Sequence, residues 1–134
     1  MADAPRPARI YETALYAPDV DASTRFYAGV LGLRVIDPPD EHSAAFRLDG
    51  GGVLLLFDPR RTSAAGRFVP AHGAEGAGHV AFTVAGLDAF KSHLERAGVA
   101  IEREIEWPRG GRSVYFRDPA GNSVELVEGE IWAP

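Results

Sequence analysis

The sequence predicts an α+β fold in which two tandem βαβββ modules form curved mixed sheets around a cavity. Two pairs of segments align between the halves of the chain, 12–22 with 79–89 and 46–56 with 116–126. A stretch at 60–77, rich in Gly, Ala, Pro and Arg, separates them as a linker would. We therefore expect a single domain over residues 1–134, built from module one at about 9–58, a linker at about 59–77, module two at about 78–128 and a tail at 129–134.

Module one begins with alternating apolar and polar residues from 10 to 17, which predict a strand. Asp19 or Asp21 can cap the helix that follows, on which Phe26, Val30 and Leu31 share a face, and Gly32 ends it. Three further strands are predicted at 33–36, 44–48 and 53–57, with three glycines forming the last turn.

Module two repeats this order. A strand is predicted at 79–84 and a helix at 87–97 that Gly98 ends. Its remaining strands are predicted at 99–105, 113–116 and 123–127, and the turn residues of 118–122 join the last two.

Charge and cysteine content exclude several classes of function. The 19 acidic and 14 basic residues give a net charge of −5 without a basic run, so nucleic acid is not an expected partner. The absence of cysteine excludes disulfides, thiolate metal sites and a cysteine nucleophile. No apolar run has membrane-spanning length and the first residues do not resemble a secretion signal, so we expect a cytoplasmic protein with no membrane partner.

The strand phase of module two places polar side chains toward the cavity. Val80, Phe82 and Val84 form one apolar face, which should pack on the helix and leave His79 on the opposite, concave face. The same alternation places Glu125 on the concave face, and Ser113, Tyr115 and Arg117 with it.

The two modules differ at these positions. The repeat aligns Glu12 with His79 and Leu55 with Glu125, so three of four equivalent positions carry side chains that can bind a metal.

The repeated order of elements and two groups of residues resemble the vicinal oxygen chelate superfamily over residues 9 to 128. The groups are Asp19, Phe26, Tyr27 and Val30 to Leu33 in module one, and Tyr115 to Asn122 with Glu125 and Leu126 in module two. The superfamily includes glyoxalase I, fosfomycin-resistance enzymes, extradiol dioxygenases, methylmalonyl-CoA epimerases and metal-free bleomycin-binding proteins. The resemblance implies a glyoxalase-like fold but does not select one of these chemistries.

The resemblance implies a divalent metal site. His79 and Glu125 match the ligand positions of the second module, and Glu12 occupies the register where most members have His. Leu55 occupies the register of a fourth, carboxylate ligand in glyoxalase I and cannot coordinate. One imidazole and two carboxylates suit Mn, Mg or Fe, with Zn and Ni as alternatives. The opposing interpretation is a polar cavity without metal, in which these carboxylates pair with arginines.

Other side chains are candidates for substrate binding. Tyr115 lies where fosfomycin-resistance enzymes and several dioxygenases place a tyrosine that hydrogen-bonds the substrate, and it is a candidate catalytic residue together with Glu12, as ligand or general base. Arg47 and Arg117, related by the repeat, can bind an anionic group. Trp107 lies at the tip of a loop that we expect to be flexible. His72, in the linker, is a weaker candidate for capping the cavity.

We expect a glyoxalase-like, metal-dependent lyase, isomerase or resistance-type transferase that acts on a small oxygenated molecule. The alternative is a metal-free protein that binds and sequesters a drug or metabolite, as the bleomycin-binding relatives do. A third interpretation, an extradiol dioxygenase, departs further from the pattern, because those enzymes present two His and one Glu. The expected assembly is a homodimer, in which the modules pair within one chain or between chains.

Overall fold

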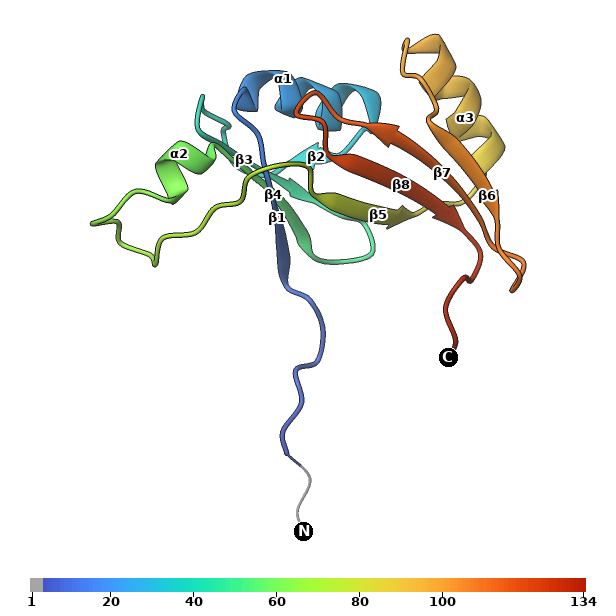
Figure 1. Cartoon of the computed structure of the whole chain (residues 1–134), viewed down its shortest axis with the longest axis horizontal. Helices are drawn as coiled ribbons and strands as arrows, with labels where there is room; N and C mark the ends of the chain where they lie inside the picture. Colours follow the sequence, from blue (N-terminus) through green and yellow to red (C-terminus); the bar gives the residue numbers. More distant parts are fainter. Residues whose placement is uncertain (1–3) are drawn as a thin grey trace.

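The computed structural model describes residues 4–134 and contains two four-stranded mixed sheets, one from each half of the chain (Figure 1). Sheet one has the order β1-β4-β3-β2 and sheet two the order β5-β8-β7-β6. In each sheet the first strand pairs in parallel with the last and lies at an edge. The bounds are β1 Glu12–Tyr16, β2 Arg34–Val35, β3 Ser43–Arg47, β4 Val53–Phe57, β5 His79–Thr83, β6 Arg103–Glu106, β7 Arg112–Arg117 and β8 Ser123–Glu128. The predicted α+β architecture of two βαβββ modules is confirmed.

The main helices cover one side of the two sheets (Figure 1). Helix α1 (Val20–Arg25) begins at Asp19, whose Oδ1 accepts from the backbone N–H of Ala22 at 3.0 Å. It continues as the π-helical turn η1 (Phe26–Val30), and α3 spans Leu87–Arg96. The linker contains a short helix that the sequence pattern did not predict, α2 (Pro59–Thr62), which Asp58 caps. No helix within residues 4–134 has both the length and the apolar character needed to cross a membrane.

The core lies between the helices and the sheets, and strand alternation decides which residues enter it. In β4, Leu54 and Leu56 are almost fully buried while Leu55 is only partly buried and faces the other, concave side. In β5, Val80 and Phe82 pack against the core cluster as predicted, and His79 faces the concave side. In β4 and β5, therefore, the residues predicted to face the core and the concave side do so in the structure.

Two predicted elements differ in detail. The helix of module one buries Tyr27, which the expected apolar face of Phe26, Val30 and Leu31 omitted, because the backbone widens into a π-turn there. The second strand of module two, predicted at 99–105, begins only at Arg103, and Val99 and Ile101 before it pack on the core.

A buried hydrogen-bond network joins the two modules. Tyr27 of η1 donates its hydroxyl to Oδ2 of Asp118 at 2.7 Å, and the Asn122 amide donates to the same oxygen at 3.0 Å. Asn122 also donates to the carbonyl of Tyr16 and accepts from the N–H of Gly78. Burial, then the charge and hydrogen bond of Asp118, raise the pKa of the Tyr27 phenol well above its ordinary value, so Tyr27 acts as a donor.

Replacing Tyr27 by Phe should destabilise the protein by about 1 to 3 kcal/mol, because it removes the donor from a buried polar network while it keeps the ring. Urea unfolding of the two proteins measures the difference. Tyr11→Phe, at a side chain that is 68% exposed, is the matched control and should leave stability unchanged. Equal stability of Tyr27→Phe and wild type would show that the network contributes nothing.

Candidate functional site

The concave face of sheet two holds the candidate site, and His79 lies on it at the start of β5. The ring Nδ1 lies 3.1 Å from the carbonyl oxygen of Ser123, its partner across the β5–β8 ladder. A carbonyl oxygen only accepts, so Nδ1 carries the proton, and in the neutral ring Nε2 carries the free lone pair. The main chain of β8 thus sets both the orientation and the tautomer of the imidazole.

Glu125 lies beside His79 on β8, and its two carboxylate oxygens have different surroundings. Oε1 lies 3.3 Å from Nε2 of His79. Oε2 accepts a hydrogen bond of 2.6 Å from the hydroxyl of Ser113, which in turn accepts one of 2.8 Å from the indole N–H of Trp107. Glu125 is 5% exposed and Ser113 is 1% exposed, so this polar chain is buried beneath a half-exposed imidazole.

The contact between His79 and Glu125 brings two hydrogen-bond acceptors close together. With Nδ1 protonated and the ring neutral, Nε2 and Oε1 are two acceptors that face each other at 3.3 Å. Either a second proton on His79 or a divalent cation bound by both atoms removes this repulsion. One imidazole nitrogen and one carboxylate oxygen are a donor set that fits a metal ion. Both groups are held in position by hydrogen bonds at their other polar atoms, Nδ1 of His79 and Oε2 of Glu125.

Tyr115 is the cross-strand neighbour of Glu125. Its ring stacks with that of His79, with centroids 6.4 Å apart and planes inclined by 23°. Partial burial, followed by the hydrogen bond and charge of Glu125, raises the pKa of the Tyr115 hydroxyl above its ordinary value. Tyr115 is therefore a protonated donor at the edge of the His79–Glu125 pair.

The structure does not bring Glu12 to this pair within one chain. Glu12 lies on sheet one, where it is exposed at the edge strand β1. Within residues 4–134, no three side chains of His, Cys, Asp or Glu gather as a metal cluster. Leu55 lies on the concave face of sheet one between Ala14 and Ala45, its neighbours on either side.

The remaining candidates lie farther from the pair. The Arg117 guanidinium donates to both carboxylate oxygens of Glu102 and to the carbonyl of Gly121. Arg47 contributes to the lining of a cavity of about 500 Å³ between the modules, of which neither His79 nor Glu125 is a lining residue.

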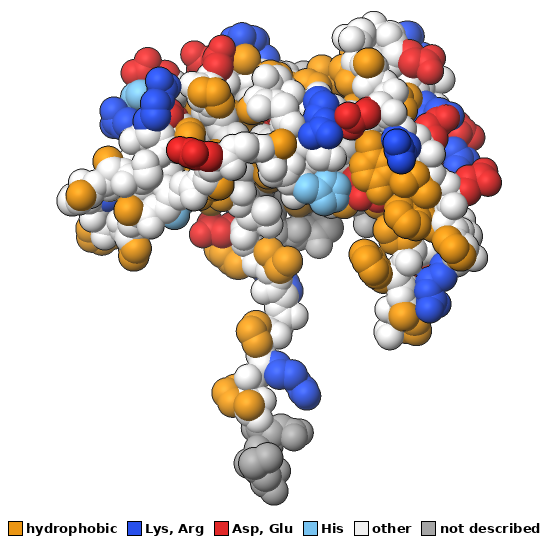
Figure 2. Space-filling model, in the orientation of Figure 1, with side chains coloured by type: hydrophobic (Ala, Val, Ile, Leu, Met, Phe, Trp, Pro, Cys, Tyr) orange, Lys and Arg blue, Asp and Glu red, His pale blue; other side chains and the backbone are white. Residues whose placement is uncertain are grey.

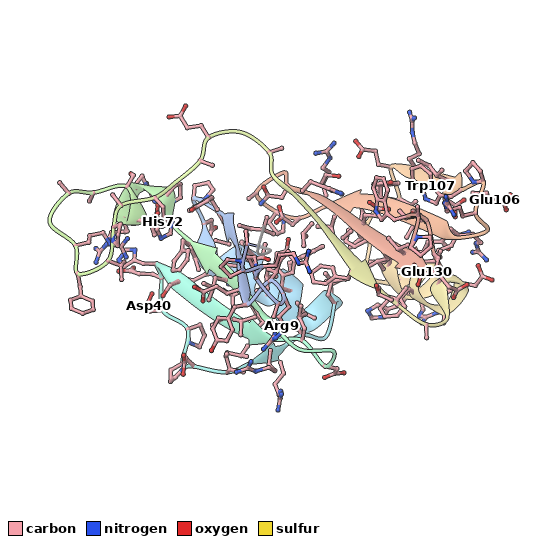
Figure 3. The ribbon with its side chains drawn as sticks, turned by 90° about the horizontal axis from the view of Figure 1, so that it is seen from below. Arg9, Asp40, His72, Glu106, Trp107 and Glu130 are labelled. Carbon is pink, nitrogen blue, oxygen red and sulfur yellow. The ribbon has the colours of Figure 1, made fainter. Side chains whose placement is uncertain are left out.

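Trp107 and His72 lie at opposite ends of the molecule (Figure 3). His72 accompanies module one, where its Nδ1 lies 2.5 Å from the hydroxyl of Tyr16 and its ring packs on Phe57. Trp107 starts a tight turn in which its N–H and the carbonyl of Gly111 bond at 2.8 Å. The expected loop tip is thus part of a hydrogen-bonded turn whose indole points back to Ser113.

Sequence reasoning placed Ser113 on the concave face but gave it no role. The signal was present, because Ser113 lies two residues before Tyr115 on the same face of β7. The hydrogen bond from His79 to the Ser123 carbonyl involves a main-chain atom, so no residue type in the sequence indicates it. It becomes visible only in the pairing of β5 with β8.

Sheet two presents this site on an open face. Figure 2 shows hydrophobic side chains gathered over β7 and β8, with acidic and basic side chains around them. An open concave sheet of this kind can accept a ligand, a second sheet or both.

Comparison with known proteins places this fold among relatives. The model of the Glyoxalase/Bleomycin resistance protein/Dioxygenase superfamily matches residues 9–126. The crystal structure of lactoylglutathione lyase from Agrobacterium tumefaciens is 43% identical, with a TM-score of 0.89 over 96% of this chain and 98% of that chain. The uncharacterized protein YwkD of Bacillus subtilis (strain 168) is 31% identical over 128 residues, 89% of this chain and 95% of its own. Biphenyl-2,3-diol 1,2-dioxygenase 3 of Rhodococcus globerulus is 30% identical over 131 residues, 88% of this chain and 62% of that enzyme.

Proposed function

Because the chain belongs to the Glyoxalase/Bleomycin resistance protein/Dioxygenase superfamily, we propose that it is a divalent-metal-dependent enzyme of the lyase or isomerase type acting on a small oxygenated substrate. The observation that carries the proposal is the 3.3 Å approach of His79 Nε2 and Glu125 Oε1. Each of these atoms belongs to a group whose other polar atom is already held by the protein. The similarity to a lactoylglutathione lyase over nearly the whole chain supports the reaction type.

His79 and Glu125 would hold the metal, with Glu12 as the third ligand or as the general base. A bound divalent cation supplies a Lewis acid that polarises neighbouring substrate oxygens. Tyr115, protonated and adjacent to Glu125, donates a hydrogen bond to a substrate oxygen. The hydrophobic side chains over β7 and β8 would contact the apolar part of the substrate and exclude water (Figure 2).

Glu12 would reach the site from a second copy of the chain. Strands β1 and β5 both lie at sheet edges, so each has an unpaired side toward which another sheet can come. We propose a two-fold homodimer in which module one of each chain covers the open face of module two of its partner. The exposed position of Glu12, away from His79 and Glu125 of its own chain, supports this arrangement.

Metal analysis and an activity assay test the function. Purified protein, or protein incubated with Mn(II), Fe(II), Ni(II) or Zn(II), should hold about one metal ion per chain and act on lactoylglutathione or a related small thioester or hydroxy compound. Protein that takes up none of these ions would contradict the metal-dependent function and favour a protein that binds and sequesters a small molecule without turnover.

Replacing Leu55 by Glu tests the arrangement of the cavity. Leu55 faces the concave side between two alanines, so the variant has room for a carboxylate at the register that matches Glu125. Added to the proposed ligand set, this carboxylate should tighten metal binding on the order of tenfold or shift the preferred metal. Isothermal titration measures the affinity, and the neutral Leu55→Gln is the matched control. Equal metal affinities of the wild type, Leu55→Gln and Leu55→Glu, all folded, would place Leu55 away from the metal.

A further inference from the structure

We infer that Trp107 and Ser113 are positioning residues that fix the Glu125 carboxylate so that only Oε1 is offered to a cation. The inference rests on the proposed metal-dependent function, and it assigns roles that the repeat and the family pattern do not contain. It follows from the direction of two hydrogen bonds, Trp107 Nε1 to Ser113 Oγ at 2.8 Å and Ser113 Oγ to Glu125 Oε2 at 2.6 Å.

The direction of this chain is fixed at its first member. An indole N–H donates and cannot accept, so Ser113 Oγ must accept from Trp107. The single hydroxyl proton of Ser113 is then directed to Glu125 Oε2, which must be the acceptor. Trp107 thus fixes the direction in which the Ser113 hydroxyl proton points, and this hydroxyl binds one of the two carboxylate oxygens of Glu125.

These hydrogen bonds leave Oε1 of Glu125 as the oxygen that faces His79. With Oε2 occupied by a charge-assisted hydrogen bond, Oε1 points to Nε2 of His79 as a one-oxygen ligand. The burial of Ser113 and Glu125 keeps water from competing for Oε2. The alternation of β7 places Ser113 and Tyr115 on the same face of the sheet, and β8, which carries Glu125, is the strand paired with β7. The carboxylate is therefore oriented before any ion arrives.

The turn that carries Trp107 is itself held in place. Trp107 and Gly111 form a closed turn, and Gly111 packs so closely on Glu130 and Ile131 that an added Cβ would lie 2.6 Å from the Ile131 side chain. The C-terminal tail thus braces the turn from outside the sheet. The indole is fixed at its base by this packing and at its nitrogen by Ser113.

Metal-free protein provides the first test, which does not depend on the proposed function. The indole N–H resonance of Trp107 in a ¹⁵N–¹H spectrum should shift in Ser113→Ala and in Glu125→Gln, while that of Trp132 should not move. Trp132 is 79% exposed and serves as the internal reference. A Trp107 resonance that is the same in wild type and both variants would overturn the inference, whatever the metal result.

Metal affinity provides the second test. Titration with Mn(II) or Zn(II) should show a roughly 10-fold loss of affinity in Ser113→Ala, since residues that hydrogen-bond to metal ligands contribute about 10- to 100-fold in affinity. Trp107→Phe keeps an aromatic ring but loses the N–H, so its metal affinity should fall a few-fold. The matched control Trp132→Phe should keep the wild-type metal affinity.

The double variant separates positioning from general destabilisation. If Trp107 acts through Ser113, the Trp107→Phe/Ser113→Ala protein should bind metal as weakly as Ser113→Ala alone. Multiplied losses in the double variant, or wild-type affinity in Ser113→Ala, would overturn the inference while leaving the proposed function intact. Wild-type protein that binds no metal would overturn the proposed function instead, and the resonance test would still decide whether the chain orients Glu125.

Discussion

Replacing His79 by Ala should abolish tight binding of divalent metal and the activity that depends on it. The imidazole supplies the only nitrogen of the proposed ligand set, and its Nε2 lies 3.3 Å from Glu125 Oε1. Without the imidazole the remaining oxygens would hold an ion far more weakly, by at least the roughly 10- to 100-fold in affinity that is lost when a residue hydrogen-bonded to a metal ligand is removed. Titration calorimetry and elemental analysis of the variant measure the loss.

The half-exposed position of His79 makes this a clean experiment, because truncation at the surface of a strand leaves the core untouched. His42→Ala is the matched control, since His42 lies in a loop where it pairs with Glu41. Undiminished metal binding in folded His79→Ala protein would remove His79 from the ligand set. The His79–Glu125 contact would then be an ion pair and nothing more.

Mixing two inactive variants should restore activity if the modules are exchanged between chains. In an exchanged dimer, a chain with Glu12→Ala still supplies His79 and Glu125, and a chain with His79→Ala still supplies Glu12. Each mixed dimer then contains one complete site and one site that lacks both groups. After full subunit exchange about a quarter of all sites should be intact, because about half of the dimers are mixed.

A second mixture gives the matched control. His79→Ala combined with Glu125→Ala should recover nothing in either arrangement, since both changes affect the same module. Native mass spectrometry of the mixtures shows that subunits have exchanged. If exchange occurs and the first mixture also recovers nothing, the three residues must act within one chain.

Alternation and the internal repeat were sufficient to predict which side chains lie on the concave faces of the two sheets. Leu55, His79 and Glu125 lie on the predicted faces because strand periodicity is rigid, and a slip of one residue would have buried the wrong set. The π-turn that buries Tyr27 was not predictable from a pattern of 3.6 residues per turn, and helix α2 is too short to show any periodicity.

The relation between the two concave faces could not be predicted from periodicity either. Alignment of the halves equates Glu12 with His79, but equivalence in a repeat does not mean proximity in space. Where Glu12 lies is decided by how the modules pack, which depends on tertiary contacts such as Tyr27 with Asp118. Likewise, the link from Trp107 to Glu125 depends on the path of a turn.

The network of Tyr27, Asp118 and Asn122 also bears on how this duplicated chain folds. Its hydrogen bonds cross the boundary between the halves, and Phe26 of the first half packs on Phe116 of the second. Separating the halves would expose both aromatic rings and leave the Asp118 carboxylate without its phenol donor, so the loss of one half destabilises the other. The chain should therefore melt in a single cooperative transition. Each half repeats the same order of strands, and the buried contacts between the halves make the stability of each depend on the other.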